Sequence, residues 1–240
     1  MRRAFSLFSL AATLTTVAAS VNLHWPYTAQ IRRQEDLLYE SQDLSIGCLD
    51  REDTTIAAQW ARTAFHDMST HNTGDGRGGL HAVYVSSWIG PSRLQSRVSG
   101  LADILAMATV FAYGGCGGPL IPYRAGRVDA ASAGVLGVPE PHQDLQSHID
   151  SFARQGFTQS EMIGLVACGH AFGGVRKEDF PTMDLVNDFE LFHGSQEFSN
   201  TVVTGFLDGT TPNPLVKSPN VTMRSDDRIF SSDGGVTMQR

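Results

Sequence analysis

The stretch Leu165-Val166-Ala167-Cys168-Gly169-His170-Ala171-Phe172-Gly173-Gly174 decides how the fold of this chain is predicted. It follows Thr158-Gln159-Ser160-Glu161, in which threonine and a glutamate three positions later form the capping box typical of a helix start. We therefore predict a helix that opens at this box and is closed by Gly173-Gly174. His170 lies near its end, among small and apolar residues.

A second histidine, His66, lies near the end of an earlier helical pattern. Apolar residues recur with helical spacing from Ile56 to Met68, and Thr54 or Asp53 is the expected cap. Arg62, Phe65 and His66 stand at positions i, i+3 and i+4, so they share one face. Most Arg-x-x-x-His matches are only a surface arginine beside a histidine at the edge of the core. Whether this pair is functional must therefore be judged from the surrounding residues.

The rest of the chain predicts a mostly α fold with few and short strands. One helix is expected from about Ser99 to Phe111, and another from Gln143 to Gln155, ended by Gly156. Residues 205–240 are rich in Gly, Pro, Ser, Thr, Asp and Asn. We expect loops or an extended wrap there, with little contribution to a core.

The first twenty residues have the pattern of a secretory signal peptide. Arg2 and Arg3 precede an apolar run from Phe5 to Val17, and Ala18-Ala19-Ser20 offers a cleavage site. We expect residues 1–20 to be removed and residues 21–240 to form one secreted domain. Without Arg2 and Arg3, 16 of the 18 basic residues stand against 25 acidic ones, and they form no cluster. Nucleic acids and anionic membranes are therefore poor partners.

The three cysteines, Cys48, Cys116 and Cys168, favour a disulfide in an oxidising compartment. With three cysteines, one disulfide always leaves one free thiol, and the spacing does not show which two cysteines pair. Asn220-Val221-Thr222 is the sequon at which glycosylation is expected.

Six short motifs follow one another along the chain: Arg62-x-x-Phe65-His66-Asp67, Asp75-Gly76-x-Gly78-Gly79-Leu80, Ala102 to Ala106, Gly126 to Ala130, Val138 to Pro141, and Leu165 to His170. In this order they resemble the plant and fungal secretory haem peroxidases, and most of all the fungal class II-like members. The resemblance covers about residues 44–80 and 99–233. The order of the motifs is much more specific than any one of them.

The resemblance implies an all-helical domain that holds haem b between a distal and a proximal helix. Such a protein uses hydrogen peroxide to oxidise a small reducing substrate, for example a phenol, and we expect a monomer. A histidine and an arginine one turn apart would supply the acid–base group and the fixed cation for peroxide. The implied roles are His66 as distal base, Arg62 as distal cation, Phe65 on the distal haem face, His170 as axial iron ligand through Nε2, Pro139 and Pro141 at the haem edge, and Asp103 with Arg127 as a buried ion pair.

The distal side departs from the family pattern. The family's calcium-binding Asp and Ser are replaced by His81 and Val83, while Asp67 retains one ligand position. Weak or no calcium binding is expected. No asparagine occurs between Asn72 and Asn187 to orient His66. A zinc site at His66, Asp67 and His71 is disfavoured, because the histidine spacing misses the i, i+4 geometry.

The proximal side departs as well. The family has Phe-Asp-Asn where this chain has Phe198-Ser199-Asn200, and we read that aspartate as the partner of the proximal histidine. Ser199 would then donate little electron density to iron, so weak activity is expected. Residues 81–98 carry no family character, and the chain ends at Arg240, earlier than family domains do. Two alternatives follow: a degenerate, non-catalytic haem-binding or structural secreted protein, or a peroxidase gene altered locally at residues 81–98 and at the C-terminus.

Overall fold

Helices α3 (Ile56–Met68) and α5 (Leu101–Gly115) pack on each other and form the first core cluster. The computed structural model describes residues 48, 50–51, 54–82, 100–130 and 137–240. The signal-peptide prediction and the divergent segment from Val83 onward lie outside these residues. The buried side chains between the two helices include Ala57, Trp60, Ala64, Leu101, Ile104, Leu105 and Ala108.

Three local interactions fix the start of these helices. Thr55, one residue later than expected, caps α3 by accepting the N–H of Ala58 at 3.1 Å. The cap residue of α5 is Gly100, which has no side chain, and the carboxylate of Asp129 accepts the N–H groups of Leu101 and Ala102 instead. A Cβ on Gly100 would come within 2.5 Å of that carboxylate, so glycine leaves room for it.

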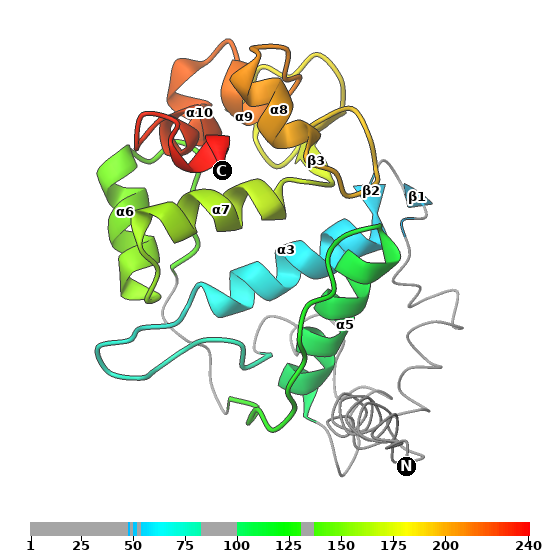
Figure 1. Ribbon diagram of the computed structural model, residues 1–240, viewed down its shortest axis with the longest axis vertical. Helices are drawn as coiled ribbons and strands as arrows, with labels where there is room; N and C mark the ends of the chain where they lie inside the picture. The colour runs from blue at the N-terminus through cyan, green and yellow to red at the C-terminus, as the bar shows by residue number, and fades with distance from the viewer. Residues whose placement is uncertain (1–47, 49, 52–53, 83–99, 131–136) are drawn as a thin grey trace, which may run out of the picture.

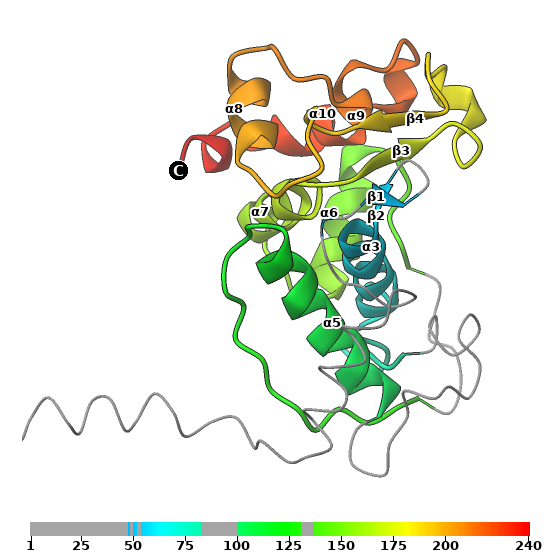
Figure 2. The ribbon, with the colours of Figure 1, turned by 90° about the vertical axis from the view of Figure 1, so that its right-hand side faces the viewer.

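The second core cluster lies between α6 (Leu145–Arg154), α7 (Gln159–Gly169) and the C-terminal elements. The latter are α8 (Thr201–Leu207), α9 (Pro214–Lys217), the 3-10 turn η2 (Val221–Met223), α10 (Ser225–Phe230) and η3 (Thr237–Gln239). Figures 1 and 2 show α8, α9 and α10 at one end of the long axis, α7 and α3 in the middle, and α5 toward the other end. The cluster includes Phe152, Met162, Ile163, Ala167, Val202, Ile229, Phe230 and Met238.

The prediction for the C-terminal tail was therefore wrong. Residues 205–240 form short helices, and Ile229, Phe230 and Met238 are buried in the core. Composition averaged over the tail hides these few apolar residues among many polar ones. Each helix of the tail is too short to give a periodic pattern, so tertiary packing rather than propensity stabilises it.

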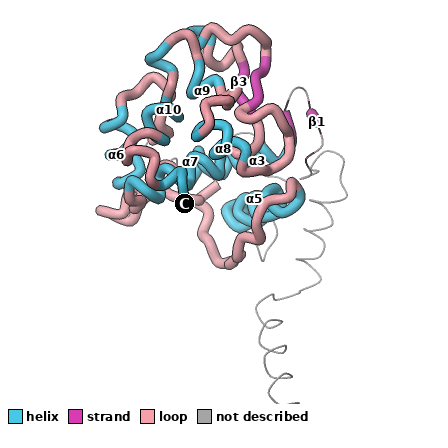
Figure 3. The backbone as a smooth tube through the Cα atoms, turned by 45° about the horizontal axis from the view of Figure 1, so that its top comes forward, coloured by secondary structure: helices cyan, strands magenta, loops and turns pink. Residues whose placement is uncertain are grey.

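Strands are short, as expected, and form two antiparallel pairs. The strands β1 (Asp50–Arg51) and β2 (Thr54–Thr55) lie before α3. After α7, β3 (Gly174–Arg176) pairs with β4 (Phe189–Leu191) across the turn η1 (Pro181–Met183). Figure 3 shows how little of the described chain is strand. A third, smaller cluster around Val175, Met183 and Phe192 packs beneath this hairpin.

The capping box of α7 is confirmed, but the end of this helix differs from the prediction. Thr158 and Glu161 make both bonds of the box. The helix ends at Gly169 with His170 as its C-cap, whereas Gly173 lies beyond it and Gly174 opens β3. Gly173 has a φ of +84°, and a Cβ there would come within 2.9 Å of the Cβ of Ala58 in α3. Gly173 therefore permits a close approach to α3, Gly174 leaves room for the backbone of Glu190 in β4, and neither glycine closes the helix.

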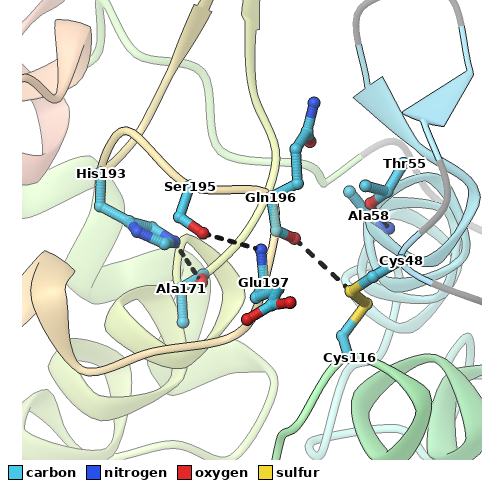
Figure 4. The surroundings of a disulfide bond; sticks show 9 residues. All are labelled: Cys48, Thr55, Ala58, Cys116, Ala171, His193, Ser195, Gln196 and Glu197. Atoms are coloured by element: carbon cyan, nitrogen blue, oxygen red, sulfur yellow. Dashed lines mark hydrogen bonds between the residues drawn. A yellow bond between two sulfur atoms is a disulfide. The ribbon is translucent and has the colours of Figure 1, made fainter.

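A disulfide and an ion pair fix the two ends of α5. Cys48 bonds to Cys116 just beyond the helix (Figure 4). Cys168 is therefore the free thiol. Near the other end, Asp103 pairs with Arg127 at 3.1 Å and also accepts the N–H groups of Gly126 and Arg127. The predicted ion pair is thus confirmed. Among the described residues, no helix combines the length and apolar character needed to cross a bilayer.

Candidate active site

His170 lies at the end of α7 with its ring fixed on two sides. Its Nδ1 is 2.7 Å from Oδ2 of Asp226, a residue of α10 that is completely buried. The ring stacks on Phe192, with 4.2 Å between the centroids. Because a carboxylate only accepts hydrogen bonds, Nδ1 carries a proton, and in the neutral imidazole the lone pair then lies on Nε2. This is the arrangement in which a histidine is held ready to ligate a metal.

Asp226 corrects the expectation that His170 lacks a carboxylate partner. That expectation rested on Ser199, whose hydroxyl instead lies 2.7 Å from that of Thr201 at the start of α8. The carboxylate comes from α10, in the part of the chain predicted to be loop. A local signal existed: Ser225-Asp226-Asp227 followed by Ile229-Phe230 is an acidic first turn before an apolar pair.

His66 lies in the last turn of α3, in a half-buried position. Burial, and then the positive charge of Arg62, lower the pKa of His66 from 6.5 to about 4. The imidazole is therefore neutral over most of the acidic range and can accept a proton. Arg62 is exposed, and its guanidinium lies 3.7 Å from the carboxylate of Asp179, beyond β3.

Phe65, between them in sequence, points toward the second core cluster. Its ring centroid lies 5.9 Å from that of Phe152 in α6 and 6.4 Å from that of His66. The side chain is only half-buried. Phe65 thus connects α3 with the helix pair that carries His170.

Asp67, predicted as a residual calcium ligand, is buried at the end of α3. Its Oδ2 accepts the backbone N–H groups of His81 and Ala82 at 2.6 and 2.7 Å. A cation would have to compete with both donors for this oxygen. The described ranges contain no group of three or more side chains that could hold a metal ion.

Pro139 and Pro141 lie in the half-buried segment before α6. Arg228 of α10 donates to the carbonyl oxygens of Pro141 and Gln143 at 2.6 and 2.9 Å. Since Asp226 belongs to the same short helix, α10 connects the partner of His170 with this segment.

Other histidines and the cavity lie outside this constellation. His148 and His193 are buried and bond to the main-chain carbonyl oxygens of Asp144 and Ala171, as expected of structural residues, while His142 is exposed. A cavity of about 420 Å³ opens near the end of α3, lined by residues that include Met68, His81 and Arg127. Neither His66 nor His170 lines it.

Comparison with known proteins gives relatives of several kinds. A WSC domain-containing protein from Arthroderma benhamiae is 33% identical over 90% of this chain and 34% of its own length. A mitochondrial cytochrome c peroxidase from Yarrowia lipolytica is 27% identical over 65% of this chain and 48% of its own length. The peroxisomal L-ascorbate peroxidase 5 of Arabidopsis thaliana is 30% identical over 53% of this chain and 44% of its own length. The chain thus spans between about a third and a half of these relatives.

The family model described as peroxidase matches residues 90–234, more than half of the chain. The match begins after α3 and includes both His170 and Asp226. The narrower likeness to class II-like members stays a prediction. The family model, the helical fold and the relatives named as peroxidases together show that the chain belongs to the haem peroxidase superfamily.

Proposed function

We propose that this protein binds haem b through Nε2 of His170 and uses hydrogen peroxide to oxidise a small reducing substrate, for example a phenol. The observation that carries the proposal is the 2.7 Å hydrogen bond between Nδ1 of His170 and the buried Asp226. A carboxylate in this position raises the basicity of the ligating nitrogen and fixes the plane of the ring. The greater electron donation would stabilise the oxidised states of a bound iron.

The residues around His170 fit a flat cofactor. Axial ligation of haem iron requires an imidazole nitrogen with a free lone pair, which the bond to Asp226 leaves at Nε2. On α7, a Cβ added to Gly164 or Gly169 would meet no atom of another element within 4 Å. At these two positions the helix that carries His170 is therefore not packed against another element. Haem bound there would supply the redox chemistry that cleaves the peroxide O–O bond.

His66 and Arg62 divide the acid–base and electrostatic work. His66, neutral above about pH 4, would take a proton from one oxygen of the peroxide and return it to the departing oxygen. The guanidinium of Arg62 stabilises the negative charge that develops on the departing oxygen. To do so it must leave Asp179, and an exposed ion pair of this kind opposes that movement only weakly.

The proximal side has the carboxylate that the family pattern calls for, whereas the distal side still lacks the family's asparagine. Asp226 removes the proximal reason for weak activity, because His170 has its carboxylate. The missing asparagine in residues 73–186 remains a distal reason. The competing function, a degenerate haem-binding protein without catalysis, is disfavoured because Arg62 and His66 both stand on α3 and the pKa of His66 suits a base.

Secretion, a monomeric state and an approach of the reducing substrate past Pro139 and Pro141 belong to the same proposal. Secretion rests on the signal-peptide pattern of residues 1–20. The names of the relatives include mitochondrial and peroxisomal proteins, so they do not favour one compartment.

Haem titration combined with rapid mixing tests this function. His170→Ala should abolish or greatly weaken haem binding, whereas His66→Ala should bind haem like the wild type. After mixing with peroxide, wild-type haem spectra should change, and His66→Leu should slow that change by about 10²–10⁴-fold. Equal haem binding by wild type and His170→Ala would refute the axial ligand. Haem binding without a peroxide reaction would support the non-catalytic alternative.

A further inference from the structure

Asn213 is a buried amide in direct contact with the partner of His170. It is completely inaccessible to solvent and lies at the cap position of α9. Its Nδ2 donates to Oδ2 of Asp226 at 2.8 Å, and Nδ1 of His170 donates to the same oxygen at 2.7 Å. One carboxylate oxygen therefore serves an imidazole and an amide.

The structure fixes which way this amide points. Oδ1 of Asn213 accepts the backbone N–H of Leu215 at 2.8 Å, the first-turn bond that caps α9. If the amide were turned over, its NH₂ would face this N–H and its oxygen would face the carboxylate, and both contacts would be lost. Pro214 follows at the first helical position, where its missing N–H costs nothing. The capping bond thus holds the NH₂ group against Asp226.

Two donors on one oxygen share its negative charge. Each hydrogen bond then draws less electron density than it would alone, which weakens the pull of Asp226 on the Nδ1 proton of His170. On Oδ1, the hydroxyl of Ser225 lies at 3.4 Å, a long contact that balances the charge only slightly. The strength of the His170–Asp226 bond therefore depends on Asn213.

We infer that Asn213 is a positioning residue that limits how far Asp226 drives His170 toward imidazolate, and so limits electron donation to a metal bound at Nε2. The inference rests on the proposed function for its effect on haem. It concerns this chain's own hydrogen bonds, so the Nδ1 proton of His170 reports it with or without haem.

Two substitutions separate this role from the capping of α9. Asn213→Ser retains an oxygen that can cap the helix, but it is too short to reach Asp226. Asn213→Leu fills a similar volume with an apolar group, so that no water replaces the lost donor. The matched control is Asn220→Ser, because Asn220 caps η2 through the N–H of Thr222 and bonds to Thr182, away from His170. All proteins are made without glycosylation, since Asn220 belongs to the sequon.

Histidine-selective NMR of the purified protein gives the first measurement. Loss of the second donor should strengthen the remaining bond, so the Nδ1–H proton of His170 should move downfield in both Asn213→Leu and Asn213→Ser. Asn220→Ser should leave it in place. In the haem-loaded protein, the iron–imidazole stretching frequency should rise and the ferric/ferrous potential should fall in the same variants.

The outcomes separate the two claims. If wild type binds no haem, the proposed function fails, and the consequence for a bound metal fails with it. If wild type binds haem but Asn213→Ser leaves the Nδ1–H signal, the vibration and the potential unmoved, Asn213 only caps α9 and the inference is wrong. Equal shifts in Asn220→Ser would show a general effect of a lost cap and would overturn it too.

Discussion

His66 has a proton affinity far below that of an ordinary histidine, which predicts an unusual pH profile. With a pKa near 4, the neutral base predominates from pH 7 down to about pH 5. The second-order rate constant with peroxide should stay level over that range and fall below about pH 4, as His66 takes up a proton. Stopped-flow measurements across this range test it. An inflection near pH 6.5 would show that burial does not act on His66 as described.

Removal of the neighbouring charge should move that inflection. Burial is the larger cause of the lowered pKa and Arg62 the smaller, so Arg62→Leu should raise the pKa of His66 toward 6.5 without reaching it. The rate constant at neutral pH should fall as well, because the cation that we propose for the departing oxygen is gone. Arg77→Leu, at an exposed arginine outside this site, is the control. An unmoved inflection would leave burial as the only cause.

Asp226 predicts a contrast between two substitutions. Asp226→Asn removes the negative charge beside Nδ1 of His170, so the ferric/ferrous potential should rise and the peroxide reaction should slow by about 10–100-fold. Ser199→Asp, which would restore the family's Phe-Asp-Asn, should change neither, because the position faces Thr201. Redox titration of haem-loaded variants tests both. A lower ferric/ferrous potential in Ser199→Asp would show that the side chain at position 199 can act as the carboxylate partner of His170.

At this scale, the sequence predicted what is local and missed what is distant. Arg62 and His66 are four positions apart on one helix, so helical geometry alone brings them together. The capping box at Thr158 predicts the helix that has His170 near its end. Asp226 is 56 positions from His170, and no periodicity connects a single aspartate in a polar tail with a distant histidine. Only the packing of α10 on α7 does so.

At the scale of elements, α10 carries more contacts than its six residues would indicate. Ile229 and Phe230 fill the second core cluster, Asp226 meets His170, and Arg228 reaches the segment before α6. The sequence predicted long helices well because their apolar spacing repeats several times. It predicted α10 as loop because a helix of fewer than two turns repeats nothing.

Arg228 predicts how this element acts on the segment of Pro139 and Pro141. Arg228→Leu removes the donors to Pro141 and Gln143, and hydrogen bonds to charged groups contribute about 1.5–3 kcal/mol each. Hydrogen exchange at residues 137–144 should therefore accelerate, and the free energy of unfolding should fall by about 1–3 kcal/mol. The same substitution at the exposed Arg77 should change neither. Unchanged exchange in Arg228→Leu would show that other contacts hold the segment.

For the whole molecule, the disulfide between Cys48 and Cys116 is the largest single constraint on the unfolded chain. It joins residues 68 positions apart. Replacement of both cysteines by alanine should lower the free energy of unfolding by ~2–4 kcal/mol, because the unfolded state gains freedom. Cys168→Ser should change it by less than ~0.5 kcal/mol, as exposed substitutions usually do. Urea titrations of both variants test this. Equal free energies of unfolding for the two variants would show that the disulfide does not stabilise the protein.

Because that bridge uses two of the three cysteines, the chain has one place for a covalent label. Cys168 is exposed, stands two positions before His170 and is bonded to no other cysteine. Partial covering of its sulfur raises the pKa of the thiol, so maleimide dyes should attach slowly at neutral pH and readily at mildly alkaline pH. A fluorophore there would be quenched by a haem on the neighbouring histidine, and its brightness would report cofactor loading directly.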